Sequence, residues 1–196
     1  IRSKGPLLVI VIGLALFAFI AGDAWKVLQP HQSQDVGEVN GETISAQDFQ
    51  ALVEEYTEVV KFSSGLNALS DEQTNQIKDE VWRAYVNNKL IENEAEKLGL
   101  TVSKAELQAI IDAGVHPMLQ QTPFRNPQTG AFDKDMLKKF LVDYSKMNKA
   151  QMPAQYAEYY NSMYNFWAFV EKSLVQARLQ EKYQALITKS LFSNPV

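Results

Sequence analysis

An unbroken run of apolar residues near the N-terminus constrains this chain more than any other feature. The run is LLVIVIGLALFAFIA, from Leu7 to Ala21, and the uncharged span around it extends from Gly5 to Gly22. This span reaches the lower end of the roughly 17–25 residues with which a helix crosses a hydrocarbon core. A helix satisfies its backbone hydrogen bonds within one segment, so it is the form that a single span takes in lipid. We therefore expect a transmembrane anchor over residues 1–25.

The charges beside the run predict its orientation. Arg2 and Lys4 precede it, whereas Asp23 follows it directly and Lys26 is the nearest positive charge beyond. A basic flank favours the cytoplasm, so we expect a single-pass inner-membrane protein with its N-terminus cytoplasmic and its domain periplasmic. Two alternatives are a cleaved signal peptide, whose apolar core is about 7–15 residues, and a buried helix of a soluble protein. The expected anchor side chains are Leu7, Val9, Val11, Leu14, Phe17 and Ile20.

Composition excludes several classes of function. The chain of 196 residues has no cysteine, which rules out disulfides, thiolate catalysis and cysteine-based metal sites within it. Its net charge of -4 gives no basic footprint for nucleic acid. No sequence motif points to a cofactor. The chain starts at Ile1 rather than Met, and we expect it to be a fragment of a longer protein.

The remainder of the chain is patterned as one helical domain, at 36–196, after a short polar linker at 26–35. Asn40-Gly41 lies between two short alternating segments, which is the strongest two-residue signal for a tight β-hairpin. Apolar residues then recur at three- and four-residue spacing, which predicts amphipathic helices. The expected helices follow capping residues at Ser45, Ser70, Ser103 and Asp133, and the last runs from 153 to about 190. The predicted fold class is mainly α, with one small hairpin.

Four segments, in this order, resemble the SurA N-terminal-domain-like region of periplasmic folding factors. They are VNGETI (39–44), WRAYVNNKLIENEAEKLGL (82–100), TVSKAELQAI (101–110) and FRNPQTGAFD (124–133). Together with the single N-terminal anchor, they are most similar to the PpiD-like family of membrane-anchored peptidyl-prolyl isomerases. The resemblance covers about residues 36–190. It implies a helical chaperone domain that carries parvulin domains in the full-length protein.

The resemblance therefore implies an isomerase parent, but this segment is expected to be non-catalytic. A parvulin domain is not readable in the sequence. The two histidines of the chain are His31, in the linker, and His116, before Pro117. Isomerase activity would come from residues beyond Val196. Acidic clusters at 54–58 and 92–96 offer paired carboxylates for acid–base chemistry. The alternative reading of these clusters is the solvated face of an amphipathic helix.

The most informative cluster is aromatic and lies in the last helix. Its positions go around the helix rather than along one stripe, so some side chains are expected on an exposed surface, which tends to mark a binding site. The candidate client-binding residues are Tyr159, Met163, Phe166, Trp167 and Phe169. The alternative is that the helix threads the middle of the domain and is buried on several sides.

Three functions remain open on the sequence alone. The first is a chaperone module that binds unfolded or newly translocated polypeptides at the inner membrane, and the resemblance implies the Sec translocon as a neighbour. The second is an isomerase whose activity lies outside this segment. A third reading is a structural subunit of an envelope complex, with the helices as its assembly interface.

Overall fold

The computed structural model describes residues 35–148 and 151–192, and the predicted anchor lies outside these ranges. The fold is mainly helical with one small antiparallel hairpin, as predicted. None of the described helices is both long enough and apolar enough to span a bilayer. The elements are β1 (Asp35–Val39), β2 (Glu42–Ser45), α2 (Ala46–Ser64), α3 (Asp71–Lys97), α4 (Lys104–Ala113), the 3₁₀ turn η1 (Leu119–Gln121), α5 (Lys134–Lys146) and α6 (Ala154–Phe192).

The hairpin forms at the predicted turn. Asn40 and Gly41 both have positive φ, at 54° and 85°, as a type I′ turn requires. Val39 pairs with Glu42 across the turn, and this register buries Val39 and Ile44 on one face. The turn residues thereby decide which side of the hairpin meets the helices.

Side-chain caps define where the helices begin. The hydroxyl of Ser70 accepts from the backbone N–H of Gln73, whose side chain accepts in return from the Ser70 N–H. Ser103 and Glu106 form the same reciprocal capping box on α4. Ser45 and Asp133 cap α2 and α5 through single side chains. These contacts confirm all four predicted helix starts.

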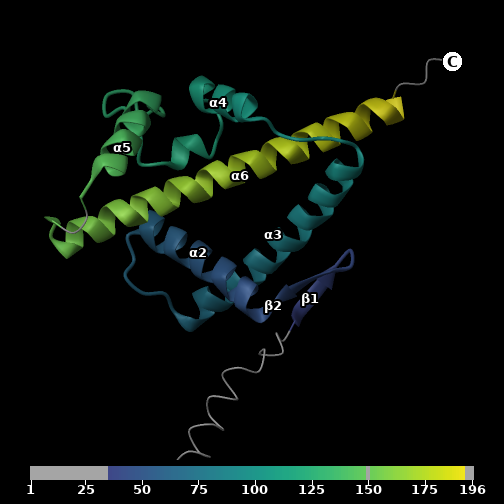
Figure 1. Ribbon diagram of the computed structural model, residues 1–196, viewed down its shortest axis with the longest axis horizontal. Coiled ribbons are helices and arrows are strands. Elements are labelled where there is room, and N and C mark those ends of the chain that lie inside the picture. Colours follow the sequence, from purple (N-terminus) through teal and green to yellow (C-terminus); the bar gives the residue numbers. More distant parts are fainter. Residues whose placement is uncertain (1–34, 149–150, 193–196) are drawn as a thin grey trace, which may run out of the picture.

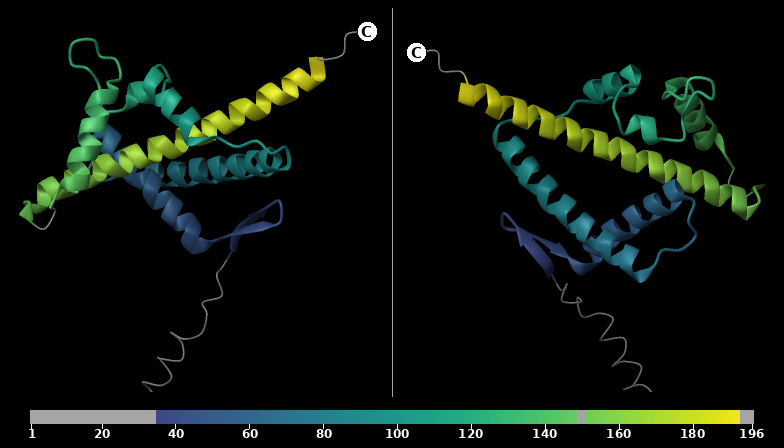
Figure 2. Two further views of the ribbon diagram at one scale, coloured as in Figure 1. Left: turned by 45° about the horizontal axis from the view of Figure 1, so that its top comes forward. Right: turned by 180° about the vertical axis from the view of Figure 1, so that it is seen from behind.

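Helix α6 is the central element of the domain. It runs the full width of the molecule, with α2, α3 and the hairpin on one side and α4, η1 and α5 on the other (Figure 1). The view from behind in Figure 2 shows the same division. Neighbours on two sides explain why the apolar residues of α6 do not keep to one stripe.

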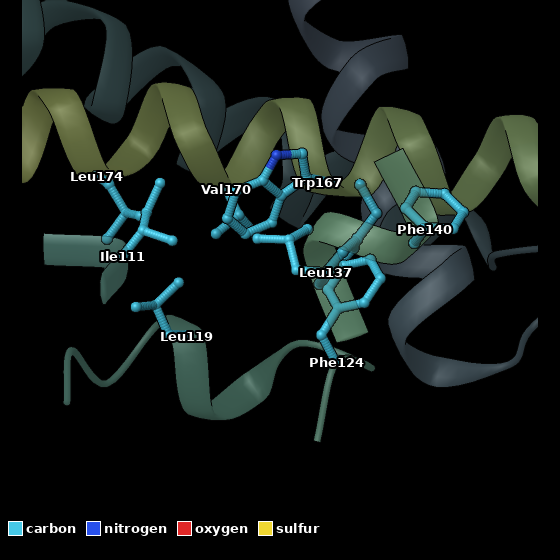
Figure 3. Packing of buried hydrophobic residues seen from close by; sticks show 9 residues of the cluster. Ile111, Leu119, Phe124, Leu137, Phe140, Trp167, Val170 and Leu174 are labelled. Atoms are coloured by element: carbon cyan, nitrogen blue, oxygen red, sulfur yellow. The ribbon is translucent and has the colours of Figure 1, made fainter. Parts of the chain in front are cut away.

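The larger core lies between α6 and the α4–η1–α5 segment. Trp167, Val170 and Leu174 project from α6 toward buried side chains of that segment (Figure 3). The buried partners are Ile111, Leu119, Phe124, Leu137 and Phe140. A second, smaller core of Val53, Ile77 and Val81 joins α2 to α3. The domain thus has two apolar cores, one on either side of α6.

The hairpin is held against α3 by a close contact between Gly37 and Trp82. A Cβ atom at position 37 would lie 2.3 Å from the indole ring, so only glycine fits there. Trp82 also packs edge-on against Phe49 of α2, with ring centroids 5.9 Å apart. This contact fixes the hairpin beside α2 and α3.

Candidate functional site

An open cleft lies where α2, α3 and α6 meet. Its volume is about 550 Å³, within the range of known ligand pockets. Apolar side chains from all three helices, with Met118 from the segment before η1, form much of its lining. These apolar residues are Leu52, Val81, Ala84, Met118, Phe169 and Ala177. The cleft can therefore accept apolar side chains without a rearrangement of the two cores.

Polar contacts across the cleft join each pair of its three helices. Lys172 of α6 lies 3.1 Å from a carboxylate oxygen of Glu55 on α2. The amide of Gln176, also on α6, donates to Glu92 on α3. All four residues line the cleft, so its rim is polar and its walls are largely apolar.

The third cross-helix contact joins α2 to α3. The Tyr56 hydroxyl donates to Oε2 of Glu80 at 3.2 Å. Burial raises the pKa of Tyr56 above its usual value, and the negative charge of Glu80 raises it further. Tyr56 therefore keeps its proton at neutral pH and remains a hydrogen-bond donor to the Glu80 carboxylate.

Lys89 is the cation on the α3 wall of the cleft, and carboxylates from two elements pair with it. Its Nζ lies 2.6 Å from Glu42 of β2 and 4.0 Å from Glu92 one turn along α3. The hydrogen bond to Glu42 raises the pKa of Lys89, and burial opposes this effect. The ammonium group is therefore charged at neutral pH and compensated by carboxylates of the chain itself.

The structure divides the five predicted client-binding residues among three environments. Phe169 lines the cleft and packs on Tyr56, with ring centroids 5.6 Å apart. Tyr159 is half exposed beside Phe62, and Met163 packs against the larger core. Phe166 and Trp167 are buried, with exposed fractions of 7% and 3%.

The expectation of an exposed surface is therefore wrong for Phe166 and Trp167. The physical reason is that other parts of the domain pack against α6 on two sides. Phe166 packs on Phe62 of α2 at 5.3 Å between ring centroids, and Trp167 packs on Phe124 at 6.0 Å. For these two residues the alternative reading, a helix that threads the middle of the domain, is the correct one.

Sequence reasoning missed most of the cleft residues. Leu52, Val81 and Ala177 appear in the sequence as ordinary buried-face positions, and Ala84 appears as a helix former. What distinguishes them is the packing of α6 across α2 and α3, which brings together residues that are 84 to 117 positions apart in the sequence. The small side chains of Ala84 and Ala177 were the available signal, because small residues leave space between packed helices.

The acidic clusters and His116 have structural contacts rather than the geometry of a catalytic pair. Glu55 and Glu92 take part in the cross-helix contacts, and Glu58 pairs with Lys61 at 2.9 Å. Nδ1 of His116 accepts from the Met118 N–H at 3.3 Å. Within residues 35–148 and 151–192, no three histidine or acidic side chains are grouped closely enough to hold a metal ion.

The described residues thus form a helical domain with a polar-rimmed, apolar-walled cleft. The family model described as the SurA-like N-terminal domain matches residues 1–141. The chain therefore belongs to the SurA-like N-terminal domain family, which is a family of chaperone-type periplasmic folding factors. Helix α6, which supplies one wall of the cleft, lies beyond the matched residues. The chain matches no curated protein and no solved structure.

Proposed function

We propose that this chain binds unfolded or newly translocated polypeptides, and that the cleft between α2, α3 and α6 is the binding site. The observation that carries this proposal is an open cleft with apolar walls in a member of a folding-factor family. The cleft exposes apolar surface that the side chains of residues 35–148 and 151–192 leave unfilled. Unfolded polypeptides present apolar side chains that a cleft of about 550 Å³ can hold.

The composition of the cleft suits a binding site of low sequence specificity. Met118 is an adaptable side chain of the kind found at promiscuous surfaces. Tyr56 and Tyr85 combine apolar rings with polar hydroxyls. Apolar burial supplies affinity without fixing a sequence, because it scales with area rather than with the direction of a bond.

The apolar run at residues 7–21 supports a second part of the proposal, that the chain is anchored in the inner membrane with its domain in the periplasm. Tethering raises the effective concentration of the cleft for polypeptides that emerge at the membrane. The Sec translocon is then a neighbour. The resemblance to PpiD-like isomerases supports a parent protein whose isomerase activity lies outside this chain.

The test fills the cleft without disturbing either core. Ala84 is exposed and lines the cleft, so an Ala84→Trp variant places a large ring inside it. Asn75→Trp is the matched control, because Asn75 is exposed on the same helix and does not line the cleft. The full chain in lipid nanodiscs is mixed with a chemically unfolded outer-membrane-type protein, and aggregation is followed by light scattering.

We expect the wild-type chain and Asn75→Trp to suppress aggregation, and Ala84→Trp to do so several-fold less well. Equal suppression by all three would place the client elsewhere on the domain. Absence of suppression at molar excess would contradict the chaperone function. Stoichiometric co-purification with one folded protein would then favour the alternative of a structural subunit in an envelope complex.

A further inference from the structure

The cleft carries an excess of negative charge. Three carboxylates line it, against two ammonium groups. Both ammonium groups are already engaged: Lys172 pairs with Glu55, and Lys89 pairs with Glu42 and Glu92. A carboxylate on a ligand would therefore meet lysines whose charge is already neutralised by carboxylates of this chain.

Glu80 differs from the other two carboxylates. Glu55 and Glu92 each have a lysine of this chain within 4.0 Å. Glu80 receives a hydrogen bond from the neutral Tyr56 hydroxyl, and among the described residues it forms no ion pair. Burial is the main cause of the raised pKa of Tyr56, and the Glu80 carboxylate raises it further because a nearby anion stabilises the protonated phenol.

Glu80 is exposed and lines the cleft together with apolar side chains. Val81 and Ala84 are its neighbours on α3, and Phe169 of α6 packs on Tyr56, the residue whose hydroxyl contacts Glu80. A ligand that fits this site presents apolar groups to those walls and a cation to Glu80. Lysine and arginine have this form, because a long apolar stem carries a charged head.

We infer that the cleft selects polypeptide segments in which a basic side chain lies among apolar ones, with Glu80 as the partner of the basic group. This inference rests on the proposed function and names the class of client that its cleft prefers. Glu80 sets the preference through charge complementarity, which tunes specificity more than total affinity. Acidic segments are disfavoured by the same carboxylate.

The test compares two fluorescent peptides that differ at one position. Both are apolar; one has a central lysine, and the other has norleucine, which keeps the stem and removes the charge. Binding is measured by fluorescence anisotropy to the full chain in nanodiscs, with empty nanodiscs as background. The variants are Glu80→Gln and, as control, Asp79→Asn, since Asp79 is exposed on α3 and does not line the cleft.

We expect wild type and Asp79→Asn to bind the lysine peptide about two- to fivefold more tightly than the norleucine peptide, the range of a partly exposed ion pair. Glu80→Gln should abolish this difference, and added salt should reduce it. If wild type binds both peptides equally and Ala84→Trp binds neither, the charge preference is overturned, but the cleft remains the binding site. Binding of neither peptide would overturn the cleft itself.

Discussion

The Nζ atom of Lys172 on α6 lies 3.1 Å from Oε2 of Glu55 on α2, although 117 residues separate the two in the sequence. Both side chains of this ion pair line the cleft. The pair shows that the cleft depends on how α6 packs across α2 and α3 rather than on any local motif. Its strength therefore bears on how readily α2 and α6 move apart.

A charge-reversal series tests this ion pair. Lys172→Glu and Glu55→Lys each place like charges together, whereas the double variant restores a pair of opposite sign. Because Lys172 is well exposed, we expect each single change to lower the free energy of unfolding by about 1 kcal/mol or less. The double variant should recover most of the loss in urea denaturation. Single variants that lose nothing even at low salt would show that the pair adds no stability.

Gly37→Ala tests the contact between the hairpin and α3. A methyl group at this position would meet the ring of Trp82 at 2.3 Å. We expect a loss of about 1–3 kcal/mol in unfolding free energy, as for other over-packed sites. Trp82→Leu removes the ring, so Gly37→Ala should cost much less in that background. An equal cost in both backgrounds would mean that the ring is not the cause.

Trp167→Ala and Tyr159→Ala separate the core of α6 from its exposed aromatic surface. Trp167 is buried in the larger core, and its truncation should cost about 3–5 kcal/mol. Tyr159 is half exposed, so its truncation should cost about 1 kcal/mol or less. Thermal unfolding followed by circular dichroism measures both. Equal losses would contradict the placement of α6 between two sets of helices.

Glu106 links stability to pH. The Ser103 backbone N–H lowers the pKa of Glu106, and the hydrogen bond from Lys182 on α6 lowers it further. A carboxyl whose pKa is lower in the folded state stabilises the fold above its unfolded pKa, and this contribution is lost as pH falls through the folded value. We expect the melting temperature to fall from about pH 5 downward, and to fall less steeply in Glu106→Gln. An unchanged slope in the variant would assign the acid sensitivity to other groups.

Membrane attachment is tested in the apolar run itself. Leu14→Arg places a charge near its centre, which costs about 2.5–3.5 kcal/mol on insertion scales. We expect the wild-type chain to float with vesicles in a density gradient and the variant to float less. Leu14→Phe, which keeps the site apolar, should behave as wild type. Flotation unaffected by the arginine would contradict a membrane span at this run.

Local signals in the sequence predicted the elements well. Asn40-Gly41 determines the hairpin turn, and Ser70 and Ser103 determine helix starts, because each acts through backbone groups within three residues. These features need only the chain near them.

The cleft could not be predicted from local signals, because it forms where distant segments of the chain pack together. The aromatic residues of α6 point to both sides of the helix, and the sequence does not say which side meets α2 and α3. The sequence therefore leaves Phe166 and Trp167 as candidate client-binding residues, although both are buried. At Ala84 the sequence signal is no more than a small side chain, because its role comes from the space beside it rather than from its own chemistry.

Site-specific photo-crosslinking tests the central claim most directly. A photoreactive amino acid is placed at Ala84 or Ala177 inside the cleft, at Tyr156 or Tyr159 on the exposed aromatic surface, and at Asn75 as background. The full chain in nanodiscs is illuminated with an unfolded client. The account predicts strong adducts from Ala84 and Ala177 and weak ones from the other positions. Adducts from Tyr156 and Tyr159 alone would contradict it and move the client to the outer face of α6.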